Sequence, residues 1–261
     1  MNLAMVLPPA AALLMSFGVV AAPNEVPVDA NIVTGLDTSD SIGRHEEWIE
    51  REGLARAVAH SSFLNAVEAG VHGRIGFSVY TWSSDGRSEV LVPWTVIASP
   101  ADAARVSRHL LSARLIDDHR FGGGDEDDGE DGEAVEEHLT DTAEAIRLGA
   151  NHLRSAPFPS QRRVINIVGN GLSNTGEQTW RARQDALEQG FIVNGLVLGR
   201  DLPNVVQHYQ AEVIGGPGSF LLQVIGPGAL TEAFTSKLRM DLASVPISNE
   251  RSFITVSHLP N

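Results

Sequence analysis

Three side chains that could bind a metal ion lie together near the start of the sequence, in the segment NIVTGLDTSDSIG (31–43). A short apolar run ends at Asp37, and Ser39 and Ser41 follow at alternate positions. Alternate residues of an extended loop point to similar sides, so the carboxylate and the two hydroxyls would converge. Oxygen donors of this kind suit hard cations such as Mg²⁺, Mn²⁺ or Ca²⁺. The spacing therefore predicts a divalent-cation site.

The charge of this donor set indicates the kind of site. One carboxylate and two neutral hydroxyls leave a divalent ion under-neutralised, so the ion would keep water and accept one more anionic oxygen from outside the domain. The competing interpretation is that Asp37 and the serines only cap the helix that follows. A phosphate-handling site of the haloacid dehalogenase type is disfavoured, because it needs a second aspartate where Ser39 stands. The sequence has no P-loop, G-x-S-x-G or H-E-x-x-H motif.

The segments around these residues alternate between strand-like and helix-like patterns. Apolar or β-rich runs predict strands at 31–37, 74–82, 88–97, 162–171, 191–199 and 215–226. Helical spacing predicts helices at 44–60, 101–113, 139–156, 177–190, 203–210 and 229–243. In the first of these helices, the spacing places Trp48, Ala55, Val58 and Ala59 on one side, which would pack inward.

This alternation predicts a three-layer α/β fold. A mostly parallel central sheet would carry helices on both faces, and the hairpin at 74–97 would add one antiparallel edge strand. In such a sheet, binding sites form beyond the carboxyl ends of the strands. Asp37 ends the first predicted strand, so the proposed cation site falls at the expected edge of the sheet.

Composition narrows the possible functions. The chain has 261 residues, of which 43% are hydrophobic, and a mean hydropathy of -0.04, which indicate a soluble globular domain with a real core. Its formal net charge of -14 argues against a nucleic-acid partner, because phosphate binding needs clustered Lys and Arg. The chain has no cysteine, which excludes disulfides, thiolate metal sites and a cysteine nucleophile.

Both ends of the chain and one internal run lie outside the alternating pattern. Residues 1–21 are apolar and uncharged and end in Val-Val-Ala, which predicts an export signal cleaved after Ala21 and a periplasmic or extracellular location. No stable membrane span is expected after cleavage. A buried helix or a retained tether is the alternative. The acidic, glycine-rich run 121–138 predicts a flexible surface insertion. The tail, 244–261, has no clear structural partner.

Roughly residues 29–243 resemble the von Willebrand factor A (VWA) fold with its metal-ion-dependent adhesion site, and more closely a family of exported bacterial proteins with that fold. The resemblance is carried by LDTSDSI, REGLARAV, YTWS, VPWTVI, RRVINIVGNG, VNGLVLG and VIGGPGSF. It implies a bound divalent cation, Mg²⁺ before Mn²⁺ or Ca²⁺, whose coordination a carboxylate on a partner protein completes. The implied ligands are Asp37, Ser39, Ser41 and Thr140, with Thr142 as the fallback for Thr140.

Two departures from the family's pattern affect this expected site. The family's last metal-site residue is an aspartate after the fourth strand, and here that position is Asn170, which keeps an oxygen donor but loses a charge. The second departure is the acidic run, which intervenes between FGGG (121–124) and Thr140, beside the proposed ion. It has three interpretations: a solvated charge run, an independent Ca²⁺ site within 125–131, or a carboxylate that blocks the ion's open position in cis.

The sequence therefore predicts a non-enzymatic, metal-dependent protein-binding domain. One alternative is an interaction or structural module whose metal site has decayed, which Asn170 motivates. Another is a hydrolase that uses the ion to activate water. The hydrolase is disfavoured because no general base or nucleophile pair stands next to D-x-S-x-S. Fold alone would not establish any of these roles.

Overall fold

The computed structural model describes residues 26–39, 43–83, 87–113, 140–173, 177–200, 202–243 and 252–257. In these ranges one sheet of seven strands runs in the order β3-β2-β1-β4-β5-β6-β7. The strands are β1 Asn31–Asp37, β2 Ile75–Trp82, β3 Val90–Ile97, β4 Arg163–Gly169, β5 Ile192–Leu198, β6 Phe220–Ile225 and β7 Ser252–Ser257. Only β2 and β3 pair antiparallel, which confirms the predicted mostly parallel sheet with one antiparallel edge strand.

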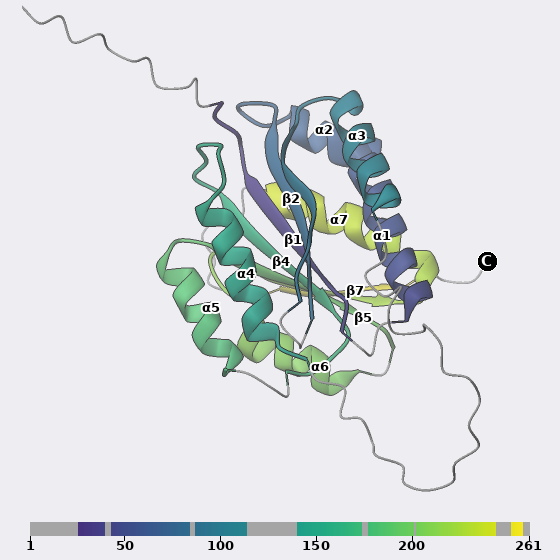
Figure 1. The fold of residues 1–261 in the computed structure, drawn as a ribbon, viewed down its shortest axis with the longest axis vertical. Coiled ribbons are helices and arrows are strands. Elements are labelled where there is room, and N and C mark those ends of the chain that lie inside the picture. The colour runs from purple at the N-terminus through teal and green to yellow at the C-terminus, as the bar shows by residue number, and fades with distance from the viewer. Residues whose placement is uncertain are drawn as a thin grey trace, which may run out of the picture.

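Helices cover both faces of the sheet (Figure 1). One face carries α1 Arg44–Val58, α2 Ser61–Glu68, α3 Pro100–Ser112 and α7 Leu230–Leu242. The other carries α4 Thr142–Arg154, α5 Thr179–Glu188 and α6 Pro203–His208, which continues as a π-helical turn, Tyr209–Val213. The predicted three-layer α/β fold is therefore confirmed, with the carboxyl ends of β1 and β4 at one edge of the sheet.

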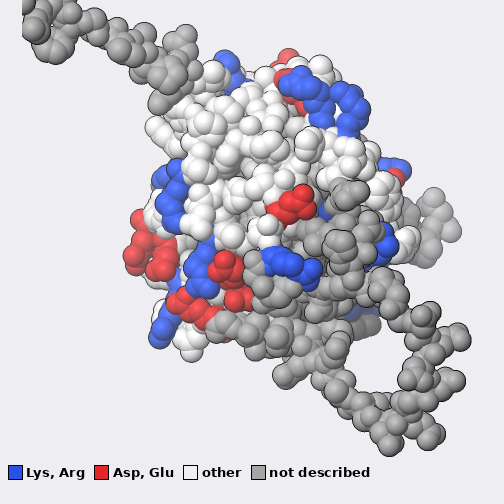
Figure 2. Space-filling model, viewed as in Figure 1, with Lys and Arg blue, Asp and Glu red and all other residues white. Residues whose placement is uncertain are grey.

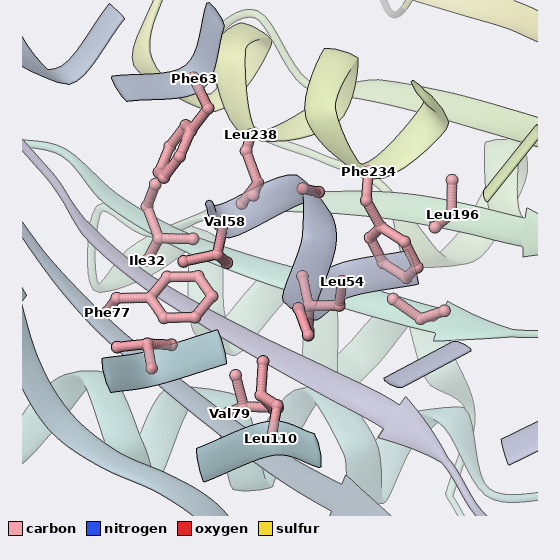
Figure 3. Packing of buried hydrophobic residues seen from close by; sticks show 14 of the residues in the cluster. Ile32, Leu54, Val58, Phe63, Phe77, Val79, Leu110, Leu196, Phe234 and Leu238 are labelled. Carbon is pink, nitrogen blue, oxygen red and sulfur yellow. The ribbon is translucent and has the colours of Figure 1, made fainter. Parts of the chain in front are cut away.

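Each face of the sheet has its own hydrophobic core. Figure 3 shows the first, where Leu54 of α1 and Phe234 of α7 pack with Ile32 of β1 and Phe77 of β2. Every residue of β1 is buried, as expected for a central strand that is covered on both sides. Full burial of each large apolar side chain of β1, such as Ile32 and Leu36, stabilises the fold by roughly 1.5–3 kcal/mol, so the strand that ends at Asp37 is firmly held.

The first helix differs from the expectation in which residues it buries. Trp48 is 39% exposed, whereas Glu47, Glu50 and Arg51 are buried beside Leu54. The prediction that Trp48 packs inward was wrong, because a hydropathy pattern assigns charged residues to the solvent. The predicted helix over 44–60 also ends at Val58, and a second helix, α2, follows directly.

The C-terminal tail also differs from the expectation. Residues 252–257 form β7, which pairs in parallel with β6 from Phe220 opposite Ser252 to Ile225 opposite Ser257. The expectation that the tail lacks a partner was therefore wrong for this segment. The predicted export signal, 1–21, and the predicted insertion, 121–138, both lie outside the described residues. Among the helices that the structure describes, none is long and apolar enough to cross a membrane.

Candidate metal centre

Asp37 lies where the carboxyl ends of two parallel strands meet. Leu36 of β1 is opposite Val168 of β4, which places Asp37 next to Gly169. A Cβ atom on Gly169 would lie 2.9 Å from Asp37 Oδ2 and 2.8 Å from the Tyr209 hydroxyl oxygen. Real Cβ atoms essentially never make contacts this close. Glycine at position 169 therefore leaves the room in which these two side chains approach the end of β4.

The carboxylate of Asp37 is fully buried, and only one of its two oxygens has a hydrogen-bond partner among the described groups. Its Oδ1 accepts a hydrogen bond from the backbone N–H of Ser39 at 2.9 Å. Its Oδ2 has no hydrogen-bond partner among the groups that the structure describes. Burial raises the pKa of Asp37 from 3.8 to about 6, and the hydrogen bonds from Ser39 oppose this rise. Such a buried oxygen requires a proton, a water molecule or a cation.

Two of the predicted hydroxyl ligands are buried near the same edge of the sheet. Ser39 is 1% exposed and Thr140 is 3% exposed. A Cβ atom on Gly171 would lie 2.8 Å from Thr140 Oγ1, so this hydroxyl lies against the loop that follows β4. Thr140 precedes the first helical residue of α4 by two positions, and the intervening Asp141 caps the helix. Ser41 lies outside the described residues.

Thr142, the fallback ligand, is engaged elsewhere. Its Oγ1 lies 2.9 Å from Thr179 Oγ1 and 3.3 Å from His208 Nε2. These contacts join α4 to α5 and α6, and the side chain is fully buried. The hydroxyl of Thr142 is thus occupied between these helices, whereas that of Thr140 lies against the loop after β4.

Asn170 shares a cavity with a carboxylate that the sequence reasoning missed. A cavity of about 300 Å³ is lined by Asn170 and by Glu50 of α1, among others. Glu50 is 4% exposed, and its pKa is raised well above the usual range by burial and then by the charge of Asp37. In the sequence Glu50 lies in EEWIERE, a pattern typical of a solvated helix face. The usable signal was its position one helical turn before Leu54, on the buried side of the helix.

These residues fit a hard divalent cation. Asp37 offers an unpartnered carboxylate oxygen, Ser39 and Thr140 have hydroxyls, and Asn170 has an amide oxygen. Across the described ranges, no three His, Asp or Glu side chains gather into a metal-binding group. A cation site at this edge therefore depends on neutral oxygens as well as on carboxylates.

The family model described as "Protein of unknown function (DUF1194)" matches residues 27–123 and 130–246. The chain belongs to this family. DUF1194 is a VWA-like family, as the sequence resemblance implied. The gap between the two matched segments falls within the predicted acidic insertion. No curated protein sequence matches this DUF1194 chain significantly.

Solved structures of VWA domains share the fold of this DUF1194 chain. Proximal thread matrix protein 1 from the mussel byssus, with a zinc-occupied MIDAS motif, has a TM-score of 0.54 at 16% identity over 84% of this chain and 48% of its own. The vWF domain of the type V pili tip protein Mfa5 from Porphyromonas gingivalis has a TM-score of 0.50 at 9% identity over 86% of this chain and 100% of its own.

The pilus adhesin SpaC from Lactobacillus rhamnosus GG has a TM-score of 0.50 at 12% identity, over 84% of this chain and 31% of its own. The DUF1194 chain thus spans about half of the mussel protein and less of SpaC. At these identities the likeness establishes the VWA fold. The neighbours' printed names describe adhesion and matrix proteins, one of them with a divalent cation in its MIDAS motif.

Proposed function

We propose that the chain is an exported VWA-like binding module that holds a divalent cation, Mg²⁺ before Mn²⁺ or Ca²⁺, and engages a carboxylate of a partner protein. One observation carries this proposal. The buried carboxylate of Asp37 has an oxygen without a partner in the described part of the chain, at the carboxyl ends of β1 and β4. A cation there would satisfy that oxygen and offset the cost of burying it.

Each residue of the site has its own role. Asp37 would hold the cation by charge, and the N–H of Ser39 fixes the orientation of its carboxylate. Ser39, Ser41 and Thr140 would add neutral oxygens, and Asn170 would act through a water molecule. Because these donors are neutral, the bound cation would supply an electrophilic contact for an anionic oxygen from outside the domain.

Three further observations support a protein partner outside the cytoplasm. The neighbours include pilus and byssus proteins, and residues 1–21 have the pattern of an export signal. In Figure 2, basic and acidic side chains are interspersed, and no purely basic patch of the kind that nucleic acids require is visible on this face. On α4, for example, Arg147 lies 3.0 Å from Glu144 and also contacts Glu177.

A second candidate is an interaction module that has lost its cation. Asn170 favours it, because a neutral amide at the position of the family's aspartate leaves the site with one negative charge fewer. In this alternative, no cation would offset the buried carboxylate of Asp37, and partner binding would be insensitive to chelators.

Calorimetric titration with Mg²⁺, Mn²⁺ and Ca²⁺ tests the proposal. We expect the wild type to bind at least one of these ions, Asp37→Ala to bind none, and both a 125–137 deletion and the matched control Asp185→Ala, on the exposed surface of α5, to bind like the wild type. Loss of binding only in the deletion would move the metal site to the acidic run. A wild type that binds no ion would leave only the second candidate.

A further inference from the structure

Glu50 of α1 is a buried carboxylate with one oxygen that lacks a hydrogen-bond partner among the described groups. It is 4% exposed, and its Oε2 makes no hydrogen bond to any described group. The guanidinium of the neighbouring Arg51 pairs with Glu47 and donates to the Ala113 carbonyl at 3.0 Å. Burial and the charges of Asp37, Glu46 and Glu47 raise the pKa of Glu50 well above its usual range, although the charge of Arg51 opposes this rise. An unpaired carboxylate in this position needs a physical explanation.

The surroundings of Glu50 connect it to the candidate metal centre. After burial, the charge of Asp37 is the main cause that raises the pKa of Glu50. Glu50 also shares the cavity of about 300 Å³ with Asn170, which directly follows Gly169, the residue that contacts the end of Asp37. Asp37 and Glu50 each have one buried oxygen without a partner in the described ranges. Two like charges placed together in this way repel each other unless a cation lies between them or a proton neutralises one.

We propose that Glu50 is an additional acidic residue of the cation site and supplies the charge that Asn170 lacks. The inference rests on the proposed function and extends it. With Asp37 and Glu50 ionised, the protein contributes two negative charges, which balance a divalent cation, although the loop after β4 contributes none. The second carboxylate reaches the site from the buried face of α1 and not from the D-x-S-x-S loop or the β4 loop.

The competing explanation is a neutral, protonated Glu50 in a cavity that holds no ion. The two explanations differ in what an isosteric amide should do. Glu50→Gln keeps the size and polarity of the side chain but removes its ability to carry charge. If Glu50 is permanently neutral, this change would leave cation affinity unaltered.

Calorimetric titration of the purified chain with Mg²⁺ at neutral pH tests the proposal, with the same titration repeated for Mn²⁺. We expect Glu50→Gln to raise the Kd at least tenfold. Glu52→Gln, which removes a half-exposed charge of the same helix that pairs with Arg56, should stay within twofold of the wild type. Circular dichroism and thermal unfolding in chelator would verify that each variant is folded.

A double-mutant cycle gives a second, independent readout. Asn170→Asp should restore the affinity of the Glu50→Gln chain to near the wild-type value and should tighten the wild type by a smaller factor. Wild-type affinity in Glu50→Gln, or equal effects of Asn170→Asp in both backgrounds, would overturn the role of Glu50 while leaving an Asp37-dependent site intact. A wild type without cation binding would overturn the proposed function and this inference together.

Discussion

Asp37 links the candidate site to the stability of the fold through its own protonation. Burial raises its pKa from 3.8 to about 6, so the folded chain binds this proton more tightly than the unfolded chain does. Between these two pKa values the folded state therefore holds more protons, and stability falls as pH rises. Above pH 6 the full cost of the buried charge is present, unless a cation offsets it.

The substitution Asp37→Asn should remove this cost in chelator. Its Oδ1 can still accept the hydrogen bond from Ser39, but no charge is buried. We expect the variant to be more stable than the wild type at pH 7 by up to about 3 kcal/mol and to lose part of the pH dependence between pH 4 and 6. Urea denaturation across pH 4.5–7.5 in chelator measures both quantities.

Adding Mg²⁺ provides the control for this prediction. If the cation binds the folded wild type and not the variant, as we propose, the wild type should gain stability with ion concentration, while Asp37→Asn should not. Asp185→Asn on the exposed surface of α5 should behave like the wild type in both conditions. An unchanged pH slope in Asp37→Asn would contradict the assignment of the buried charge.

Single residues of the site differed in how far the sequence could predict them. The positions of Asp37 at the end of β1 and of Thr140 just before α4 could be predicted because the strand and the helix have clear periodicity, while their role as ligands stays a prediction. Glu50 could not, because a charged residue among others in EEWIERE is assigned to solvent, and only tertiary packing buries it. The choice between Thr140 and Thr142 also needed the structure, since it depends on the contacts of Thr142 with α5 and α6.

At the scale of elements, a buried polar network fixes α7 to the centre of the sheet. Lys237 Nζ donates to Asn166 Oδ1 of β4 at 2.5 Å and lies 3.5 Å from Asp241 Oδ1. Asp241 also accepts hydrogen bonds from Asn166 Nδ2 at 2.7 Å and from Asn194 Nδ2 of β5 at 2.9 Å. The four side chains are buried, so α7 keeps its orientation only if the hydrogen bonds among them are all made.

Asp241→Asn should destabilise the chain more than Lys237→Met does. The first change leaves the ammonium of Lys237 buried without a counter-ion, which typically lowers the free energy of unfolding by about 3–5 kcal/mol. The second leaves Asp241 with its two amide donors and keeps an apolar stem over the Phe220 ring. Urea denaturation at neutral pH gives both free energies of unfolding.

Cation affinity separates this effect from the metal site. Asp241 and Lys237 belong to the second half of α7, and their partners on β4 and β5 precede the carboxyl ends of those strands. Both variants should therefore bind Mg²⁺ within twofold of the wild type while they are folded. Equal destabilisation by the two substitutions would contradict the predicted asymmetry.

The elements themselves were largely predictable, for a physical reason. β1 and β4 are short, mostly apolar or β-branched runs that the sheet buries, and α4 has a clear helical period that ends before Pro157. The helix α2 was missed because it is short and follows α1 after only two residues. The strand β7 was missed because five of its six side chains are exposed, which gives it no two-sided hydrophobic pattern.

At the scale of the whole molecule, β7 forms the outermost strand next to β6, although it lies C-terminal to the residues that the family model matches. The match ends at residue 246, whereas β7 covers Ser252–Ser257 and pairs along the full length of β6. β6 is mostly buried and apolar, so without β7 its backbone N–H and C=O groups would form an open, hydrophobic edge. Edges of this kind promote pairing with other chains.

Deletion of residues 244–261 should therefore cause self-association. We expect the truncated chain to show a higher, concentration-dependent mass than the wild type in size-exclusion chromatography with light scattering. A shorter deletion, 258–261, keeps β7 and should match the wild type. Because β4 and β5 separate β6 from β1, Mg²⁺ affinity should stay within twofold in any folded fraction. If the 244–261 deletion has the mass and the unfolding free energy of the wild type, β7 does not protect the sheet edge.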